Sequence, residues 1–442
     1  MKLLVLCIGI LMLTGCATHG MIVNAPKGST DAEDAYSIAT VVNRKGSEEI
    51  SLLLAFSGGG TRAAALSYGV LEGLRDTTIH VAGRSIRVLD EVDMISSVSG
   101  GSFTAAYYGV NGEAIFEDFE DVFLRRDVQA GLIRSVLNPL NWFSDTGRTD
   151  LAVSLYEDIV FQGATFADIK RAGGPLILLN ASGLGHGLRF SFVQEYFNLL
   201  CSDISSFSVA RAVAASSSVP VVFNPVVMKN YLHCETTTPD WLIKAEQHSE
   251  RNQELTMTFE LLKRYVNDSS LEYLHLVDGG ITDNLGLRAI YEIVEIVGGI
   301  EAFIDLYRRR PPRRLVIISV DAATEPALKM DRSQNPPSID ETINAMSSSQ
   351  LHRYNAATMN SIDESMESWA IQLSTPIRSV NPYFIKIRIG DIKQKEVLES
   401  LNSIPTSFSL NDQEVDLLIR SGHELLLENH DFQRLLKDLK GH

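Results

Sequence analysis

Three glycine-containing turns hold the residues of this sequence that could do chemistry, and each turn follows an apolar run. They are Ser57-Gly58-Gly59-Gly60-Thr61-Arg62, Ser97-Val98-Ser99-Gly100-Gly101 and Asp278-Gly279-Gly280. A serine hydroxyl becomes an effective nucleophile when a base removes its proton and a sharp turn exposes it to an ester carbon. Backbone amides of a glycine loop can stabilise the oxyanion that forms during attack. The three turns therefore indicate the nucleophile, base and oxyanion site of an acyl hydrolase.

Each candidate residue has an expected role. Ser99 is the candidate nucleophile because the two glycines after it permit a tight turn. Asp278 is the candidate base, and Gly58 to Gly60 form the candidate oxyanion hole. Ser97 occupies the first glycine position of the G-x-S-x-G motif, so the elbow is a variant. Arg62 is expected to fix the glycine loop or to add positive potential to the oxyanion site, and the alternative is a surface cation.

The sequence around the turns predicts the elements that position them. Apolar runs indicate strands, and apolar residues at helical spacing follow several of them. Apolar strands separated by helices predict a mainly parallel sheet covered on both faces, in a three-layer α/β/α fold. The carboxyl ends of such strands would bring the three turns to one edge of the sheet. The expected strands are Ile50 to Phe56, a run within Val88 to Val98, Pro175 to Asn180, Leu274 to Val277, Leu315 to Val320 and Tyr383 to Ile389, and the expected helices are Arg62 to Arg75, Phe103 to Tyr108, Leu287 to Val297, Ile339 to Trp369 and two within Asp412 to Leu439.

The order of the elements predicts two parts of the chain: a catalytic domain over residues 48–325, and a mainly helical C-terminal extension over 326–442 that packs on this domain. Glu113 to Lys170 contains apolar and aromatic residues, which predict either helices packed on the sheet or a cap that lines an acyl-chain entrance. Glu235 to Asn267 predicts a polar insertion with a helix near its end, and Ala322 to Ser338 predicts a loop.

The order of the motifs resembles that of patatin-like phospholipases. That family has a glycine-rich oxyanion loop, a G-x-S-x-G nucleophile elbow, and a D-G-G or D-G-A motif that carries the second member of a Ser-Asp dyad. The resemblance covers roughly Ser51 to Val320 and includes Ala210 to Pro225, which is similar to the family's small-residue helix ending before a proline. It implies a dyad of Ser99 and Asp278, a phospholipid or other lipid ester as substrate, and no metal or organic cofactor. The chain departs from the family pattern at the elbow position noted above and at Ala63, where the family has glycine.

The first residues of the chain predict export and lipid anchoring. Lys2 precedes the apolar run Leu3 to Leu13, which is too short to span a bilayer and is typical of a signal peptide over residues 1–16. Leu13-Thr14-Gly15-Cys16 resembles the lipobox of bacterial lipoproteins, which implies cleavage before Cys16 and acylation of that cysteine. The alternative is an ordinary signal peptide. Residues 17–47 are expected to be a tether. By resemblance, Ala17 in place of an aspartate favours the outer membrane of the bacterial envelope, facing the periplasm.

Two cysteines remain for the folded body, Cys201 and Cys234, because Cys7 leaves with the signal peptide and Cys16 is the lipidation candidate. An exported chain with two cysteines allows one disulfide, which would join Cys201 to Cys234. The alternative is two buried thiols. No Cys/His spacing in the sequence indicates a metal site.

Composition excludes some partners. The formal net charge of −16 argues against nucleic acid and against electrostatic docking on anionic lipid. The hydrophobic content of 45% fits a globular protein with a substantial core. The basic run Arg308 to Arg314 is interpreted as a solvated connection to the next strand, with contact to lipid phosphates as the alternative.

Three other functions compete with a Ser-Asp acyl hydrolase. A Ser-Asp-His triad could use His352, His423 or His430, but the sequence places all three within predicted helices and not at strand-end turns. Gly58 to Ala63 fits the loose dinucleotide-binding pattern, although Asp90 lies too far along the chain to serve as its acidic residue. The third alternative is a noncatalytic envelope lipoprotein that uses the fold as a scaffold.

Overall fold

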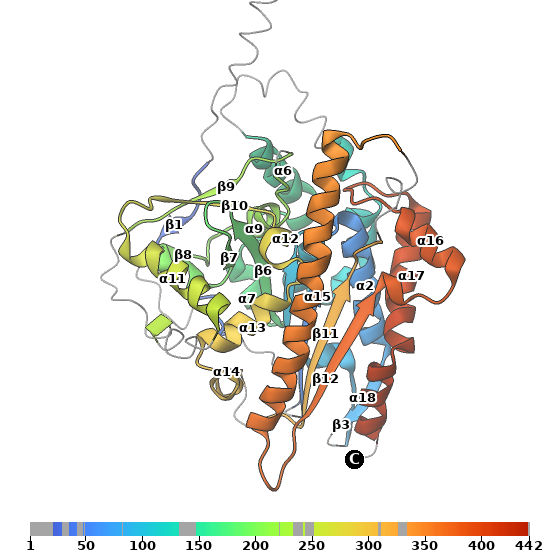
Figure 1. The fold of residues 1–442 in the computed structure, drawn as a ribbon. Helices are drawn as coiled ribbons and strands as arrows, with labels where there is room; N and C mark the ends of the chain where they lie inside the picture. The colour runs from blue at the N-terminus through green and yellow to red at the C-terminus, as the bar shows by residue number, and fades with distance from the viewer. Residues whose placement is uncertain are drawn as a thin grey trace, which may run out of the picture.

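The computed structural model describes residues 21–28, 35–41, 47, 49–81, 83–131, 147–220, 222–232, 242–243, 252–307, 311–325 and 334–440. Among these residues, the centre of the fold is an eight-stranded mixed sheet with the order β12-β11-β2-β5-β6-β10-β9, and β7 pairs with β6 outside this path (Figure 1). The strands are β2 (Ile50–Phe56), β5 (Val92–Val98), β6 (Leu176–Gly183), β7 (Leu188–Ser191), β9 (Val226–Lys229), β10 (Tyr273–Val277), β11 (Arg314–Asp321) and β12 (Asn381–Arg388).

The parallel part of the sheet runs from β12 through β11, β2 and β5 to β6. Every residue of β2, β5, β6 and β11 is buried. Continuously apolar strands take this position because helices cover both faces of a parallel sheet. The predicted fold class, a mostly parallel sheet flanked by helices with a helical C-terminal region, is confirmed.

One strand runs opposite to the prediction. β10, which precedes Asp278, pairs antiparallel with both β6 and β9. Its side chains alternate at first, with Tyr273 and His275 exposed and Leu274 and Leu276 buried. Such alternation is typical of an antiparallel strand with one face in water. The predicted strand, Leu274 to Val277, was too short for this alternation to be recognised in the sequence.

Helices cover the sheet on both sides. α15 crosses in front of β11 and β12 in Figure 1 and packs on β12, while α17 packs along α2. The helices that matter below are α2 (Gly60–Asp76), α3 (Gly100–Asn111), α6 (Arg148–Tyr156), α9 (Val209–Ser216), α11 (Gln253–Asn267), α12 (Gly280–Asp283), α13 (Leu287–Ile296), α15 (Ile339–Leu373), α17 (Asp412–Glu428) and α18 (His430–Lys440).

The remaining short elements complete the two faces. They include the hairpin of β3 (Thr78–Val81) with β4 (Arg84–Arg87), the pair of β1 (Ala25–Pro26) with β8 (Ser202–Asp203), and the helices α4 (Ile115–Phe119), α7 (Phe166–Ala172), α8 (Gln194–Leu199), α14 (Ile300–Tyr307) and α16 (Lys395–Ser403). The described parts of 113–170 are thus largely helical, as the first of the two alternatives for this segment predicted, whereas 132–146 is outside the described residues.

The C-terminal extension contributes to the sheet itself as well as covering it. β12 extends the sheet beside β11, in parallel register from Arg314↔Asn381 to Asp321↔Arg388. α17 approaches α2 so closely that a Cβ on Gly69 would lie 2.0 Å from the carbonyl oxygen of Ile419. The extension predicted to pack on the catalytic domain therefore completes its core.

Part of the segment predicted to be a tether, residues 17–47, is packed on the body. β1 pairs with β8, and the side chain of Asn24 is buried. Tyr36 is fully buried, where its hydroxyl donates to the Ile177 carbonyl at 3.0 Å and accepts from the Ile177 amide at 2.7 Å. Polar composition suggested a linker, but these few anchoring side chains give the segment a place in the fold. In the described part of the chain, no helix is long and apolar enough to cross a bilayer.

Candidate active site

Ser99 lies on a sharp turn between β5 and α3, at the carboxyl edge of the parallel strands. Its dihedral angles are φ 49° and ψ −119°, which residues other than glycine seldom adopt. The side chain is 6% exposed. Strained backbone of this kind persists only where surrounding contacts hold it, and it is concentrated at functional sites.

The glycines after Ser99 permit contact between the elbow and the glycine loop. A Cβ on Gly100 would lie 2.0 Å from the carbonyl oxygen of Gly60, and a Cβ on Gly101 would lie 2.7 Å from that of Ser57. The Gly101 amide donates to the Ser57 carbonyl at 3.2 Å. The elbow and the predicted oxyanion loop are therefore in direct backbone contact, which no side chain at either glycine would allow.

Asp278 lies beside Ser99 in a partly buried position. Its backbone amide donates to the Ser218 carbonyl at 2.9 Å, and its Oδ1 accepts from the Gly280 amide at 2.8 Å. Burial raises the pKa of the Asp278 carboxyl to about 6, and hydrogen bonds from the Gly280 amide and the Ser99 side chain partly oppose that rise. The structure thus places the turns that carry the two predicted dyad residues next to each other, both held by the end of α9.

The strand that positions Asp278, β10, runs in a direction that the sequence did not predict. β6 runs parallel to β5 up to Asn180↔Val98 and then continues beyond the edge to Gly183. β10 pairs with this continuation in the opposite direction, with Val277↔Ser182 as its last partners. β10 therefore ends close to Val98, and Asp278, the residue after β10, lies beside the turn that carries Ser99.

The glycine loop has amides available for an oxyanion. The Gly58 amide is occupied because it donates to the Asn284 carbonyl at 2.9 Å, and the Thr61 amide donates to the Ser407 carbonyl at 2.8 Å. Among the described residues, no acceptor is found for the amides of Gly59 and Gly60. Gly59 and Gly60 have φ angles of 142° and 61°. They also lie at the amino end of α2, where the helix dipole favours negative charge.

Arg62 faces away from the reaction site and into the C-terminal extension. Its Nε donates to the Ala322 carbonyl at 2.9 Å, its Nη1 to the Ile404 carbonyl at 2.7 Å, and its Nη2 to the Thr406 hydroxyl at 3.0 Å. The side chain is 5% exposed, so it is no surface cation. Burial lowers the pKa of Arg62 to about 10, with Asp321 opposing the shift. The contacts fit the loop-fixing role better than a donor role.

Two residues that the sequence interpretation did not assign to the site, Ser216 and Asn180, fix the position of the turn that carries Ser99. Ser216, at the end of α9, accepts a hydrogen bond from the Ser99 amide at 2.9 Å. Its own hydroxyl donates to the Asn180 carbonyl at 2.6 Å. The Ser99 amide is thereby used for positioning. The run of three serines before Val219 was the available signal, but their hydroxyl partners could not be known from the sequence.

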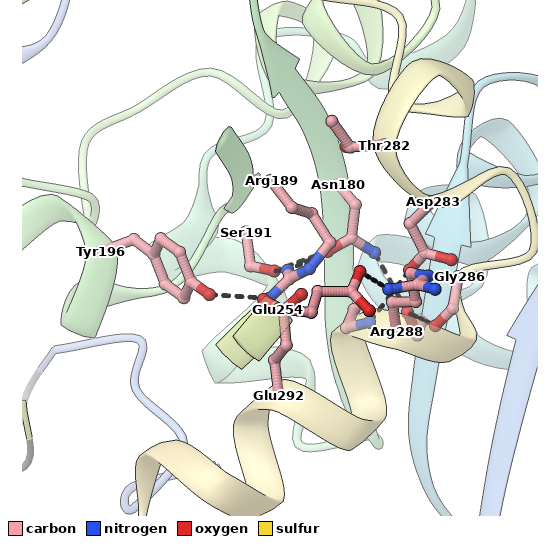
Figure 2. Close-up of polar contacts among 12 residues, drawn as sticks. Asn180, Arg189, Ser191, Tyr196, Glu254, Thr282, Asp283, Gly286, Arg288 and Glu292 are labelled. Atoms are coloured by element: carbon pink, nitrogen blue, oxygen red, sulfur yellow. Dashed lines mark hydrogen bonds and ion pairs between the residues drawn. The ribbon is translucent and has the colours of Figure 1, made fainter. Parts of the chain in front are cut away.

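Behind Asn180 lies a buried polar network, drawn in Figure 2. The Asn180 Nδ2 donates to the Ser97 carbonyl at 3.1 Å, and its Oδ1 accepts from the Ser191 hydroxyl at 2.5 Å. Arg189, which is 3% exposed, also donates to this oxygen and pairs with Glu292. A buried charge of this kind is stable only with its partners in place. The network thus couples β5, β6, β7 and α13 behind the nucleophile.

Asn284 links the glycine loop to the aspartate turn. Besides the carbonyl that accepts from Gly58, its side-chain oxygen lies 2.7 Å from where a Cβ on Gly58 would be, and 3.1 Å from one on Gly280. The sequence interpretation did not select Asn284. Asn284 therefore lies against both the turn that carries the predicted base and the predicted oxyanion loop.

The other predicted positions lie elsewhere or outside the described residues. His423 lies 3.6 Å from Asp76 on the outer side of α2, and His430 begins α18. His352, in α15, acts electrostatically on Asp321. Cys201 is disulfide-bonded, while Cys234 and Cys16 are not among the described residues.

Comparison with known proteins gives a family. Residues 54–291, more than half of the chain, match the model of the family described as Patatin-like phospholipase. Among solved structures, human GIVD cytosolic phospholipase A2 is 12% identical, with a TM-score of 0.42 over 96% of this chain and 69% of the other. The same human protein in complex with Methyl gamma-Linolenyl Fluorophosphonate is 13% identical, with a TM-score of 0.40 over 93% and 63%. Comparison with curated protein sequences gave no match. The chain belongs to the patatin-like phospholipase family.

Proposed function

We propose that the protein is a lipid acyl hydrolase that cleaves carboxylic esters through a dyad of Ser99 and Asp278. The observation that carries this proposal is that the end of α9 holds both turns: the Ser99 amide donates to the Ser216 hydroxyl at 2.9 Å and the Asp278 amide donates to the Ser218 carbonyl at 2.9 Å. This places the strained Ser99 next to the Asp278 carboxylate, whose pKa the Ser99 side chain lowers. The amides of Gly59 and Gly60, for which the described residues offer no acceptor, and the direct backbone contact between elbow and glycine loop support the same chemistry.

The proposed reaction has two half-reactions. Asp278 accepts the Ser99 proton as Oγ attacks the ester carbonyl, and the Gly59 and Gly60 amides bind the resulting oxyanion. The tetrahedral intermediate collapses, the bond to the alcohol oxygen breaks, and the alcohol takes the proton from Asp278. Water then attacks the Ser99 ester, giving its proton to Asp278. Collapse releases the fatty acid, and the proton returns to Ser99.

The dyad is favoured over a triad by the surroundings of Asp278. Burial and hydrogen bonds from Gly280 and Ser99 account for its shifted pKa, and no histidine in the described part of the chain is among the causes. A noncatalytic scaffold would have no need for a strained Ser99 beside a partly buried carboxylate, which is costly to maintain.

We also propose that Cys16 is acylated and holds the protein on the bacterial outer membrane, facing the periplasm. The lipobox-like residues before Cys16 support its acylation. Mass analysis of the mature N-terminus tests it, since an unmodified cysteine or cleavage elsewhere would reject the lipoprotein assignment.

Hydrolysis of a short-chain ester and of a phospholipid tests the proposed dyad. Ser99→Ala and Asp278→Asn should each lower kcat by about a thousandfold or more, because each removes a group on which the reaction depends. His352→Ala and Asp305→Asn serve as controls and should retain activity within about twofold. In wild type, kcat/KM should fall as pH drops below about 6, as Asp278 becomes protonated. Loss in the His352 variant would instead indicate a triad.

A further inference from the structure

Exposed apolar side chains surround the turn that carries Asp278. Val219 and Val222, in the loop after α9, are 41% and 56% exposed, and Ile281 of α12 is 53% exposed. Both loops are tied to Asp278, whose amide donates to the Ser218 carbonyl at 2.9 Å and whose carbonyl accepts from the Ile281 amide at 3.4 Å. Single exposed apolar residues are ordinary on a protein surface. Here, however, all three lie within four residues of a backbone hydrogen bond to Asp278, the proposed base.

A fourth exposed apolar residue comes from the adjoining strand pair. Leu184, directly after β6, is 54% exposed, and its amide donates to the His275 carbonyl of β10 at 2.9 Å. β10 itself leads into the Asp278 turn. We call the four residues Leu184, Val219, Val222 and Ile281 the apolar rim.

The N-terminal segment enters the fold beside this rim. Met21 lines one cavity together with Val226 and His275, and Val226 pairs with Leu276, two residues before Asp278. Asn24 holds the segment there, because its buried side chain donates to the Lys229 carbonyl at 2.8 Å. In Figure 1, β1 lies toward the same end of the molecule as β9, β10 and α12. Met21, Ile22 and Val23 are themselves 51%, 40% and 38% exposed.

The docked segment limits where the lipid anchor can be. Cys16 and Met21 are separated by five residue steps in the sequence, which span at most about 18 Å when fully extended. An acylated Cys16 must therefore lie within that distance of Met21. The net charge of −16 gives no general attraction to anionic lipid, so close contact with a bilayer must come from the anchor and from apolar side chains.

We propose that the apolar rim, together with Met21 to Val23, is the lipid-contacting face of the protein, seated on the bilayer that holds Cys16. This inference rests on the proposed lipid hydrolase function and on the acylation of Cys16. It adds an orientation: the site around Ser99 faces the membrane that carries the anchor. The substrate would be a bilayer lipid that passes from that surface to Ser99 without crossing bulk water.

The chain offers a matched control at the opposite edge of the sheet. Ile377 is 98% exposed and lies between α15 and β12, and β12 begins at the amino edge of the parallel strands. Ser99, in contrast, follows the carboxyl end of β5. Equal substitutions at Val222 and Ile377 therefore compare the two ends of the molecule with the same change in chemistry.

The test uses the full-length lipidated protein reconstituted in phosphatidylcholine vesicles. Val222→Trp should add tryptophan fluorescence that brominated phosphatidylcholine quenches, whereas Ile377→Trp should add fluorescence that it does not quench, each measured against wild type. Absence of quenching at position 222, or equal quenching at both positions, would overturn the proposed face. This readout needs no catalysis, so it can succeed even if the hydrolase proposal fails.

A kinetic test follows from the same face. The double variant Leu184→Asp/Val222→Asp should lower the rate of vesicle phospholipid hydrolysis at least tenfold more than it lowers the rate of hydrolysis of a soluble short-chain ester. Ile371, near the end of α15, is 73% exposed, so the control variant Ile371→Asp/Ile377→Asp should leave both rates unchanged. Equal losses on the two substrates, or no loss on vesicles, would contradict a lipid-contacting role for the rim. If wild type hydrolyses neither substrate, the proposed function fails and the quenching result alone decides the face.

Discussion

Ser99 and Asp278 illustrate how a reactive pair is held in a state that is unfavourable for each residue alone. Ser99 has a strained backbone, and Asp278 is a partly buried carboxylate whose pKa is raised by desolvation. Both features cost stability and persist because neighbours such as Ser216 and Gly280 hold them in place. At this scale, the proposed activity is obtained at the expense of folding free energy.

Asp278→Asn should therefore be more stable than wild type at neutral pH, while lacking activity. The unfolded carboxyl has its ordinary pKa of 3.8, whereas burial raises the folded pKa to about 6. Between these values the folded state binds more protons, so stability falls as pH rises, and above pH 6 the full cost remains. Two pKa units correspond to about 3 kcal/mol, of which we expect roughly 1–3 kcal/mol to be recovered.

Urea unfolding of both proteins at pH 7 and at pH 3.5 measures this effect. The stability difference should be present at pH 7 and should nearly vanish at pH 3.5, where the wild-type carboxyl is protonated in both states. Asp305→Asn, at an exposed aspartate, should change stability by less than about 0.5 kcal/mol. A destabilised Asp278→Asn at pH 7 would contradict the account of a strained, desolvated base.

At the scale of elements, much of the site could be predicted because glycine-rich turns after apolar runs are local signals. Gly58 to Gly60, Ser99 and Asp278 were selected in this way, and the structure places them together. The direction of β10 could not be predicted from the same signal, because a strand's partner depends on distant residues. Asp278 nevertheless reached the expected place, since β10 ends beside the carboxyl edge of β5 from the other direction.

The positioning residues could not be predicted for a related reason. Ser216, Asn180 and Asn284 act through hydrogen bonds and close contacts between elements far apart in the sequence. Arg62 was expected to contribute to the oxyanion hole or to fix the loop, and its partners turned out to lie more than 250 residues away. The partners of Arg62 can be identified only when the three-dimensional arrangement of these distant segments is known.

Arg62→Ala should weaken both the glycine loop and its attachment to the extension. It leaves the carbonyls of Ala322 and Ile404 without their charged donor, which should cost about 2–4 kcal/mol of folding stability. We expect kcat for a short-chain ester to fall about tenfold to a hundredfold, with a small change in KM, because oxyanion donors would be displaced while the substrate site remains.

Steady-state kinetics and urea unfolding of Arg62→Ala test this role, with the exposed Arg84→Ala as the matched control. Arg84→Ala should match wild type in both measurements. A normal kcat in Arg62→Ala with reduced stability would assign Arg62 to folding alone. A normal stability with reduced kcat would instead favour a direct role at the oxyanion.

At the scale of the whole molecule, the fold class was predictable and the domain boundary was not. Apolar strands separated by helices sufficed for a mostly parallel three-layer architecture. A division at residue 325 is a less accurate description of the packing, because β12 completes the main sheet and α17 covers α2. The N-terminal tether is likewise less independent than its composition suggested, since Tyr36 and Asn24 are buried. Composition describes a segment's average, and a few anchoring side chains can override it.

The central claim is that Ser99 is a nucleophile activated by Asp278. An alkyl fluorophosphonate tests it directly, because an activated serine attacks the phosphorus and displaces fluoride. Mass spectrometry of the peptide containing Ser99 should show one stable adduct in wild type, none in Ser99→Ala, and formation at least a hundredfold slower in Asp278→Asn. An adduct on another residue, or equal rates in wild type and Asp278→Asn, would contradict the account.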